Sequence, residues 1–181
     1  MVLILDSGVG SYAVVKYGID KNTKEPVAIK FYDQVKMMDP IKQRNYEAEV
    51  ANLKELDHPN IIKLHEVVEG RRKIALIMEY IGSSSLFDVM INSPKGALTE
   101  TGNLSLTIEA KLIFFQILKA LEYTHSKNII HRDIKLQNVI VGNKSVVKLI
   151  DYGFSIKVED DSKLWGFCGT PTYMSPELVK R

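Results

Sequence analysis

One short stretch of the chain, residues 131–138, reads HRDIKLQN and concentrates charge between two aliphatic runs. Three of its residue types suit phosphoryl transfer. Asp133 can accept or orient a hydroxyl proton, and Lys135 can neutralise charge on the group being transferred. Asn138 offers an amide oxygen of the kind that binds hard cations. The alternative interpretation is a buried structural cluster of salt bridges.

A second carboxylate favours the chemical interpretation. Asp151 stands in the segment LIDYGFS, thirteen residues after Asn138 and directly after a predicted strand hairpin. It supplies a second oxygen ligand for a metal. Two oxygen ligands, a lysine and a glycine-rich flap are the parts that metal-assisted phosphoryl transfer needs.

The N-terminal region supplies a flap and a further lysine. The segment GVGSYAVV contains Gly8 and Gly10 and continues as a strand, so a glycine hairpin over phosphates is favoured over a dinucleotide-binding loop, which needs a helix next. A plain hairpin turn is the alternative. Lys30 lies within an apolar strand, where an edge lysine is the alternative to a fixed cation. Glu49 is its expected helix partner, and Glu47 is the competitor.

Two regions must position these groups. Val- and Ile-rich segments predict an antiparallel sheet, and the spacing of apolar residues predicts one helix over 39–56. The predicted strands cover 1–5, 12–19, 26–32, 61–69 and 73–81. These elements form a small α+β lobe that ends near Tyr80.

A second, mainly helical region follows. The segment from Thr107, a candidate N-cap, to His125 is apolar around most of its circumference, which predicts a helix buried on several sides. Two short strands then flank a Gly-Asn turn at 142–143.

Composition excludes several classes of protein. The net charge of +2 is too small to indicate nucleic-acid binding, and no apolar run approaches the ~20 residues of a membrane span. A single cysteine, Cys168, excludes an internal disulfide and fits a reducing compartment, so we expect a cytoplasmic protein.

Together these motifs resemble the catalytic domain of eukaryotic protein kinases. The resemblance covers the whole chain and includes the glycine flap, VAIK at 27–30, HRDIKLQN at 131–138, DYG at 151–153 and SPE at 175–177. The segments LDHPNIIKLHEV and FCGTPTYMSPEL are most similar to the calcium/calmodulin-dependent and AMP-activated group of serine/threonine kinases. Lys135 and Thr170 also resemble the serine/threonine class.

The resemblance implies a bilobal fold, with residues 1–80 as the N-lobe and 81–181 as a partial C-lobe. It implies ATP and Mg²⁺ as cofactors, with Asn138 and Asp151 on the metal, and a protein Ser/Thr hydroxyl as acceptor. The implied catalytic set is Asp133, Lys135, Lys30 and Glu49. The implied nucleotide contacts are Gly8, Val9, Gly10, Val15, Ala28, Lys30, Met78, Glu79, Ile81 and Ile140, with Leu86 beside the base. Leu53, Leu64, His131 and Tyr152 would stack as a column between the lobes.

Several positions depart from the family pattern. Ala13 replaces the third glycine of the flap, and Tyr152 replaces the usual phenylalanine, so its hydroxyl needs a partner when packed. Ser85 and Gln137 stand where many relatives that select basic peptides carry glutamate. The chain also ends four residues after Glu177, so we expect a fragment that lacks the later helices of the C-lobe.

The leading interpretation is therefore an ATP-dependent protein serine/threonine kinase, present as a fragment. The main alternative is a non-catalytic nucleotide binder or scaffold derived from a kinase. A small-molecule phosphotransferase is a third option, which the segment GTPTYMSPE disfavours. No membrane or nucleic-acid partner is expected, and the sequence leaves the physiological substrate and any regulatory partner unidentified.

Overall fold

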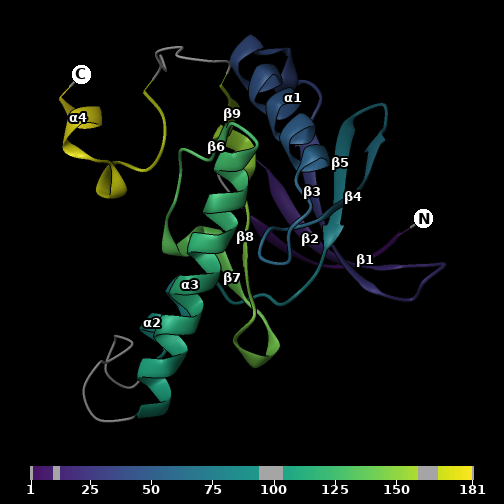
Figure 1. Ribbon diagram of the computed structural model, residues 1–181. Coiled ribbons are helices and arrows are strands. Elements are labelled where there is room, and N and C mark those ends of the chain that lie inside the picture. The colour runs from purple at the N-terminus through teal and green to yellow at the C-terminus, as the bar shows by residue number, and fades with distance from the viewer. Residues whose placement is uncertain (1, 10–12, 94–103, 159–166, 181) are drawn as a thin grey trace. The chain divides into compact units, whose positions relative to one another are not determined.

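The computed structural model describes residues 2–9, 13–93, 104–158 and 167–180 (Figure 1). The chain divides into two compact units: Met1–Glu47 with Ile62–Tyr80, and Ala48–Ile61 with Ile81–Arg181. Helix α1 (Pro40–Glu55) crosses this division, since its first half belongs to one unit and its second half to the other. The assignment of residues 1–80 and 81–181 to two functional lobes stays a prediction. Among the helices in the described ranges, none is long and apolar enough to cross a bilayer.

The first unit is built on an antiparallel sheet, as the sequence predicts. Its strands, in order across the sheet, are β1 (Val2–Val9), β2 (Val14–Asp20), β3 (Pro26–Asp33), β5 (Lys73–Glu79) and β4 (Leu64–Glu69). Strand β1 extends four residues beyond its predicted end because its pairing with β2 continues to Val9.

The central strands of this sheet carry buried apolar residues on both faces. One face carries a buried apolar cluster of Val27, Ile29 and Ile77, with Phe31 and Ala75 packed against it. Side chains alternate between faces along a strand, so Ala28 and Lys30 lie on the opposite face. Leu76, which pairs with Lys30, is 0% exposed, so the face that bears the predicted lysine is also packed.

The second unit combines helices with short strand pairs. Its named elements are α2 (Leu86–Ile91), α3 (Leu104–Ser126), β6 (Ile129–Ile130), β7 (Val139–Val141), β8 (Val147–Leu149), β9 (Ile156–Lys157) and α4 (Pro176–Val179). Strand β6 pairs with β9, and β7 pairs with β8. Figure 1 shows the β7–β8 hairpin alongside α3, which contacts β8.

The loop after α1 docks on α3 and the hairpin. The side-chain amide of Asn60 donates to Gln116 Oε1 at 2.8 Å and to the Val147 carbonyl at 2.9 Å. Gln116 in turn donates to the Ser145 carbonyl and accepts from the Val147 N–H. These bonds fix the hairpin to α3. Asn138 precedes the hairpin and Asp151 follows it.

Three details differ from the sequence-based predictions. Helix α3 begins at Leu104, so Thr107 is not its N-cap; no glycine or proline between 104 and 107 breaks the helix. The helix is buried along one stripe that includes Ile113 and Ala120, whereas the large apolar residues exposed on its other side include Leu112, Phe114, Phe115 and Leu118. The predicted Gly-Asn turn is instead a 3-10 turn over Asn143–Ser145, with positive φ at Lys144 and Ser145.

Candidate active site

The loop after β6 is organised around a buried histidine. His131 is 1% exposed, and its Nε2 lies 3.0 Å from the Ile150 carbonyl, to which it must donate. Its Nδ1 accepts the backbone N–H of Asp133 at 3.2 Å, so the ring is the neutral Nε2–H tautomer. Burial lowers the pKa of His131, which agrees with the neutral form.

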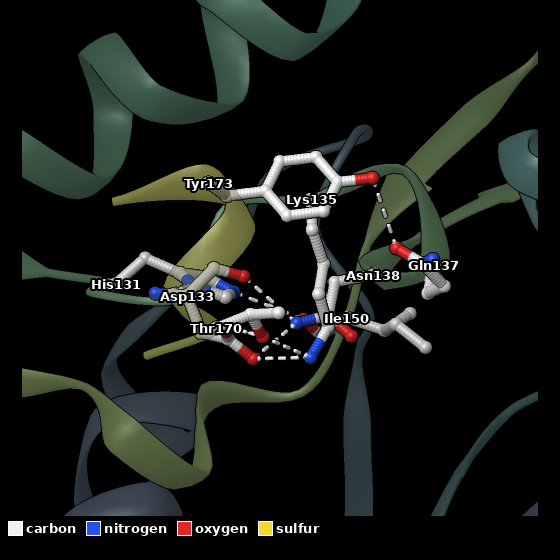
Figure 2. Close-up of polar contacts among 8 residues, drawn as sticks. All are labelled: His131, Asp133, Lys135, Gln137, Asn138, Ile150, Thr170 and Tyr173. Carbon is white, nitrogen blue, oxygen red and sulfur yellow. Dashed lines mark hydrogen bonds and ion pairs between the residues drawn. The ribbon is translucent and has the colours of Figure 1, made fainter. Parts of the chain in front are cut away.

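The Asp133 carboxylate is the centre of a network of polar contacts (Figure 2). Its Oδ2 lies 2.7 Å from Lys135 Nζ and accepts from Asn138 Nδ2 at 3.1 Å. Its Oδ1 accepts from the Thr170 hydroxyl at 2.7 Å. Lys135 also donates to Thr170 Oγ1 at 2.9 Å. Asp133 is 4% exposed, and three donors hold its carboxylate, which fixes the orientation of that group.

Two residues whose side-chain oxygens could bind a metal flank the β7–β8 hairpin: Asn138 before it and Asp151 after it. The Asn138 amide nitrogen donates to the carbonyl oxygen and to Oδ2 of Asp133, so its Oδ1 is the side-chain atom that can meet a cation. The backbone N–H of Ile150 donates to the Asn138 carbonyl at 2.9 Å, which brings the residue before Asp151 next to Asn138. A carboxylate and an amide oxygen together fit Mg²⁺.

No group of three or more His, Cys, Asp and Glu side chains that could hold a metal occurs among the residues the structure describes. The metal predicted at Asn138 and Asp151 would therefore take its other ligands from water or from phosphate oxygens, as Mg²⁺ commonly does.

A glycine brings the segment before α4 against this loop. Gly169 has φ 111°, and a Cβ on it would lie 2.8 Å from the Arg132 carbonyl oxygen. Arg132 itself has φ 65°, and its Nε donates to the Phe154 carbonyl at 2.7 Å. The close approach at Gly169 lets the next residue, Thr170, reach Asp133.

Tyr152 is completely buried beside the histidine. Its ring lies edge-on to the His131 ring, with centroids 4.6 Å apart. Its hydroxyl lies 3.0 Å from Thr124 Oγ1 on α3, which is the partner that the sequence could not identify. Burial raises the pKa of Tyr152 to about 12.

In the first unit, the strand register gathers four of the predicted nucleotide contacts on one face. Val15 of β2 pairs with Lys30 of β3, and Ala28 of β3 pairs with Met78 of β5. Directly paired residues point to the same side of an antiparallel sheet, so these four side chains share a face. Gly8 pairs with Val15 and continues this row to β1.

The remaining predicted residues lie in several places. Val9 ends β1, Gly10 lies outside the described residues, and Glu79 ends β5. Ile81 belongs to the second unit, as does Ile140, which forms a bridge with Ser85. Glu49 is buried in α1 within the second unit, whereas Lys30 belongs to the first. The pairing of Lys30 with Glu49 therefore stays a prediction.

Several residues around the loop were not singled out as site residues from the sequence. They are Thr124, Asn52, Ser155 and Gly169. Thr124 and Ser155 contact Tyr152, Asn52 donates to Ser155, and Gly169 lies against Arg132. Helix α2 was also missed, although Ser85 and Asp88 form the capping box that begins it. The S-x-x-D spacing was a local signal for that helix.

Comparison with known proteins adds an independent observation. The chain matches the protein kinase domain model over residues 5–181. It is 41% identical over 181 residues to a probable serine/threonine-protein kinase MARK-A of Dictyostelium discoideum, covering 99% of this chain and 16% of that protein. It is 35% identical over 175 residues to CBL-interacting serine/threonine-protein kinase 3 of Arabidopsis thaliana, covering 95% of this chain and 38% of that protein.

CBL-interacting protein kinase 32 of Oryza sativa is 33% identical over 176 residues, covering 96% of this chain and 38% of that protein. The chain thus spans less than two fifths of the length of each of these three relatives. The family match covers nearly all of the chain, and the ordered contacts around Asp133 lie within it. The chain therefore belongs to the protein kinase domain family.

Proposed function

We propose that this protein is an ATP-dependent serine/threonine kinase that transfers the γ-phosphoryl group of Mg-ATP to a Ser or Thr hydroxyl of a protein. The observation that carries the proposal is the Asp133 carboxylate, held by Lys135, Asn138 and Thr170. A carboxylate fixed in this way can orient an acceptor hydroxyl and receive its proton without first reorganising.

Each side chain of this loop has a distinct role in the proposal. Asp133 aligns the acceptor hydroxyl, whose oxygen forms the new P–O bond as the bond to the ADP oxygen breaks. Lys135 lies 2.7 Å from Asp133 and neutralises charge on the transferring phosphoryl group. Thr170 donates to Asp133 Oδ1 and keeps the segment that follows Gly169 beside the acceptor.

The nucleotide and metal contacts are also part of the proposal. In the first unit, Lys30 would bind the phosphates, and the shared face with Val15, Ala28 and Met78 would contact the adenine. In the second unit, Asn138 and Asp151 would hold Mg²⁺, which when bound screens the phosphate charge. The remaining predicted nucleotide contacts are proposed on resemblance alone; they are Gly8, Val9, Gly10, Glu79, Ile81 and Ile140. Glu49 is proposed as the partner of Lys30.

The finer classification rests on the same resemblance. We place the chain in the calcium/calmodulin-dependent and AMP-activated group, with 1–80 as N-lobe and 81–181 as part of a C-lobe, and we expect it in the cytoplasm. Two relatives are named as CBL-interacting kinases, which supports a search for a regulatory protein partner.

The proposal is tested by phosphoryl transfer in the full-length protein. Radiolabelled γ-phosphate should appear on serine or threonine of an acceptor protein, as read by phosphoamino-acid analysis. Lys30→Met and Asp133→Asn should each abolish the transfer, while circular dichroism shows a retained fold. Label on tyrosine alone would contradict the acceptor class, and undiminished transfer by either variant would contradict the site assignment. Mg-ATP binding with no transfer by the wild-type protein would favour the non-catalytic alternative.

A further inference from the structure

A directed chain of hydrogen bonds connects the turn after Asp151 to helix α3. Thr124 Oγ1 lies 2.8 Å from the Ala120 carbonyl and 3.0 Å from the Tyr152 hydroxyl. A carbonyl oxygen only accepts, so the single hydroxyl proton of Thr124 points to Ala120. The Tyr152 hydroxyl must then be the donor to Thr124.

Because both side chains are completely buried, removing the hydroxyl of one partner has a different energetic cost from removing the hydroxyl of the other. Thr124 and Tyr152 are each 0% exposed. If Tyr152 lost its hydroxyl, Thr124 would still donate to Ala120 and would leave no unsatisfied donor. If Thr124 lost its hydroxyl, the phenol of Tyr152 would be a buried donor without this acceptor. A buried donor that makes no hydrogen bond destabilises the folded state.

A second chain of hydrogen bonds ties the backbone of the same residue. Asn52 of α1 donates to Ser155 Oγ at 2.8 Å, and Ser155 donates to the Tyr152 carbonyl at 2.6 Å. Asn52 and Ser155 are also buried. Tyr152 is therefore held at its ring end by α3 and at its backbone by α1. Asp151, directly before it, adopts a left-handed backbone conformation with φ 60°.

We propose that Thr124 is a positioning residue for Asp151: by accepting the Tyr152 hydroxyl, it holds the Asp151–Gly153 turn in the arrangement that presents the Asp151 carboxylate to the metal. The inference rests on the proposed function, because it takes Asp151 as a ligand of Mg-ATP. It explains why a helix that is largely apolar carries a buried threonine facing a tyrosine. A phenylalanine at 152 would need no such partner.

The proposal is tested by comparing the loss of the Thr124 hydroxyl with the loss of the Tyr152 hydroxyl, since the two losses should have different effects. Thr124→Val keeps the shape of the side chain but strands the phenol, so Tyr152 should leave its position and carry Asp151 with it. Tyr152→Phe removes the donor and should be tolerated. In the double variant no phenol remains to be stranded, so the second substitution should rescue the first. Thr124→Ser, which keeps the hydroxyl, is the matched control.

The experiment measures dissociation constants for Mg-ATP and for adenosine, together with thermal unfolding, in the full-length protein and these variants. Adenosine has no phosphate and needs no metal. We expect Thr124→Val to weaken Mg-ATP binding about tenfold and adenosine binding less than twofold. The double variant should return to within about threefold of Tyr152→Phe, in both Mg-ATP affinity and melting temperature. A Thr124→Val protein that fails to fold while the double variant folds is the same rescue in a stronger form.

Three results would overturn the proposal. The effects of the two substitutions could add in the double variant, or Thr124→Val could weaken adenosine and Mg-ATP equally, which would indicate a general packing defect. Thr124→Ser could also be as impaired as Thr124→Val. A wild-type protein that binds no Mg-ATP would refute the proposed function together with the positioning role. Normal Mg-ATP binding with additive effects would refute the positioning role alone.

Discussion

Replacement of Thr170 by valine tests the network around Asp133. Valine has nearly the shape of threonine but neither donates nor accepts, so the substitution removes the 2.7 Å bond to Asp133 Oδ1 and the 2.9 Å bond from Lys135. A hydrogen bond to a charged group contributes about 1.5–3 kcal/mol. If this bond orients the carboxylate in the transition state, kcat for a peptide acceptor should fall about ten- to a hundredfold.

Steady-state peptide phosphorylation by the full-length protein measures this effect, and Thr170→Ser is the matched control because it keeps the hydroxyl. We expect the serine variant to retain kcat within about threefold of wild type, and the melting temperatures of both variants to stay close to it, since Thr170 is only partly buried. Equal losses in the valine and serine variants would indicate that the γ-methyl group matters and not the hydrogen bond. An unchanged kcat in the valine variant would refute the role of Thr170.

Three further predictions concern Gly169, which lies against the 131–138 loop, and two residues of that loop. Gly169→Ala should lower kcat at least tenfold, because the added Cβ would lie 2.8 Å from the Arg132 carbonyl; wild-type kcat would contradict this. The pKa of His131 is lowered by burial, so its contribution to stability is complete above the unfolded value of about 6.5 and is lost as pH falls. Chemical unfolding between pH 7 and 5 should therefore show a steeper loss in wild type than in His131→Phe, by at most ~1.4 kcal/mol per pH unit, and parallel curves would refute it. Gln137 is exposed and carries no charge, so Gln137→Glu would add a carboxylate that can pair with an arginine of the peptide. In a peptide series, kcat/KM for peptides with upstream arginine should rise about tenfold, with Gln137→Ala as the control. Equal kcat/KM values in the two variants would be evidence against this prediction.

Local patterns in the sequence predict the parts of the fold that local physics determines. The Val- and Ile-rich segments around Lys30 predict the antiparallel sheet because β-branched residues favour extended backbone and alternate between faces. The HRDIKLQN segment predicts the polar loop because a group of charges between apolar runs must be presented by a buried frame. The structure adds the register, in which Val15 lies opposite Lys30 and Ala28 opposite Met78.

The contacts that the sequence does not reveal join residues far apart in the chain. Thr124 and Tyr152 are separated by 28 positions, and Asn52 and Ser155 by 103. No periodicity or local motif relates such pairs, since each depends on how α3 and α1 pack against the turn. The need for a partner at Tyr152 was predictable, because a buried phenol requires one, but its identity was not.

The start of α3 shows a different kind of error. A threonine before an apolar periodic run is a favoured N-cap, so Thr107 was a reasonable choice from the sequence. The helix instead begins three residues earlier, at Leu104. Leu104 and Leu106 favour helical backbone, and a capping preference at Thr107 does not end a helix where the residues before it are also helix formers.

Single-turnover phosphoryl transfer by Asp133→Asn, measured beside its Mg-ATP affinity, tests the central claim most directly. The account predicts that the variant binds Mg-ATP within about threefold of wild type, because the proposal places Asp133 at the acceptor hydroxyl and not at the nucleotide. It predicts that the rate of transfer to a peptide serine falls at least a hundredfold, within the range that a positioned acid–base group contributes. A single-turnover rate equal to that of wild type would contradict the account.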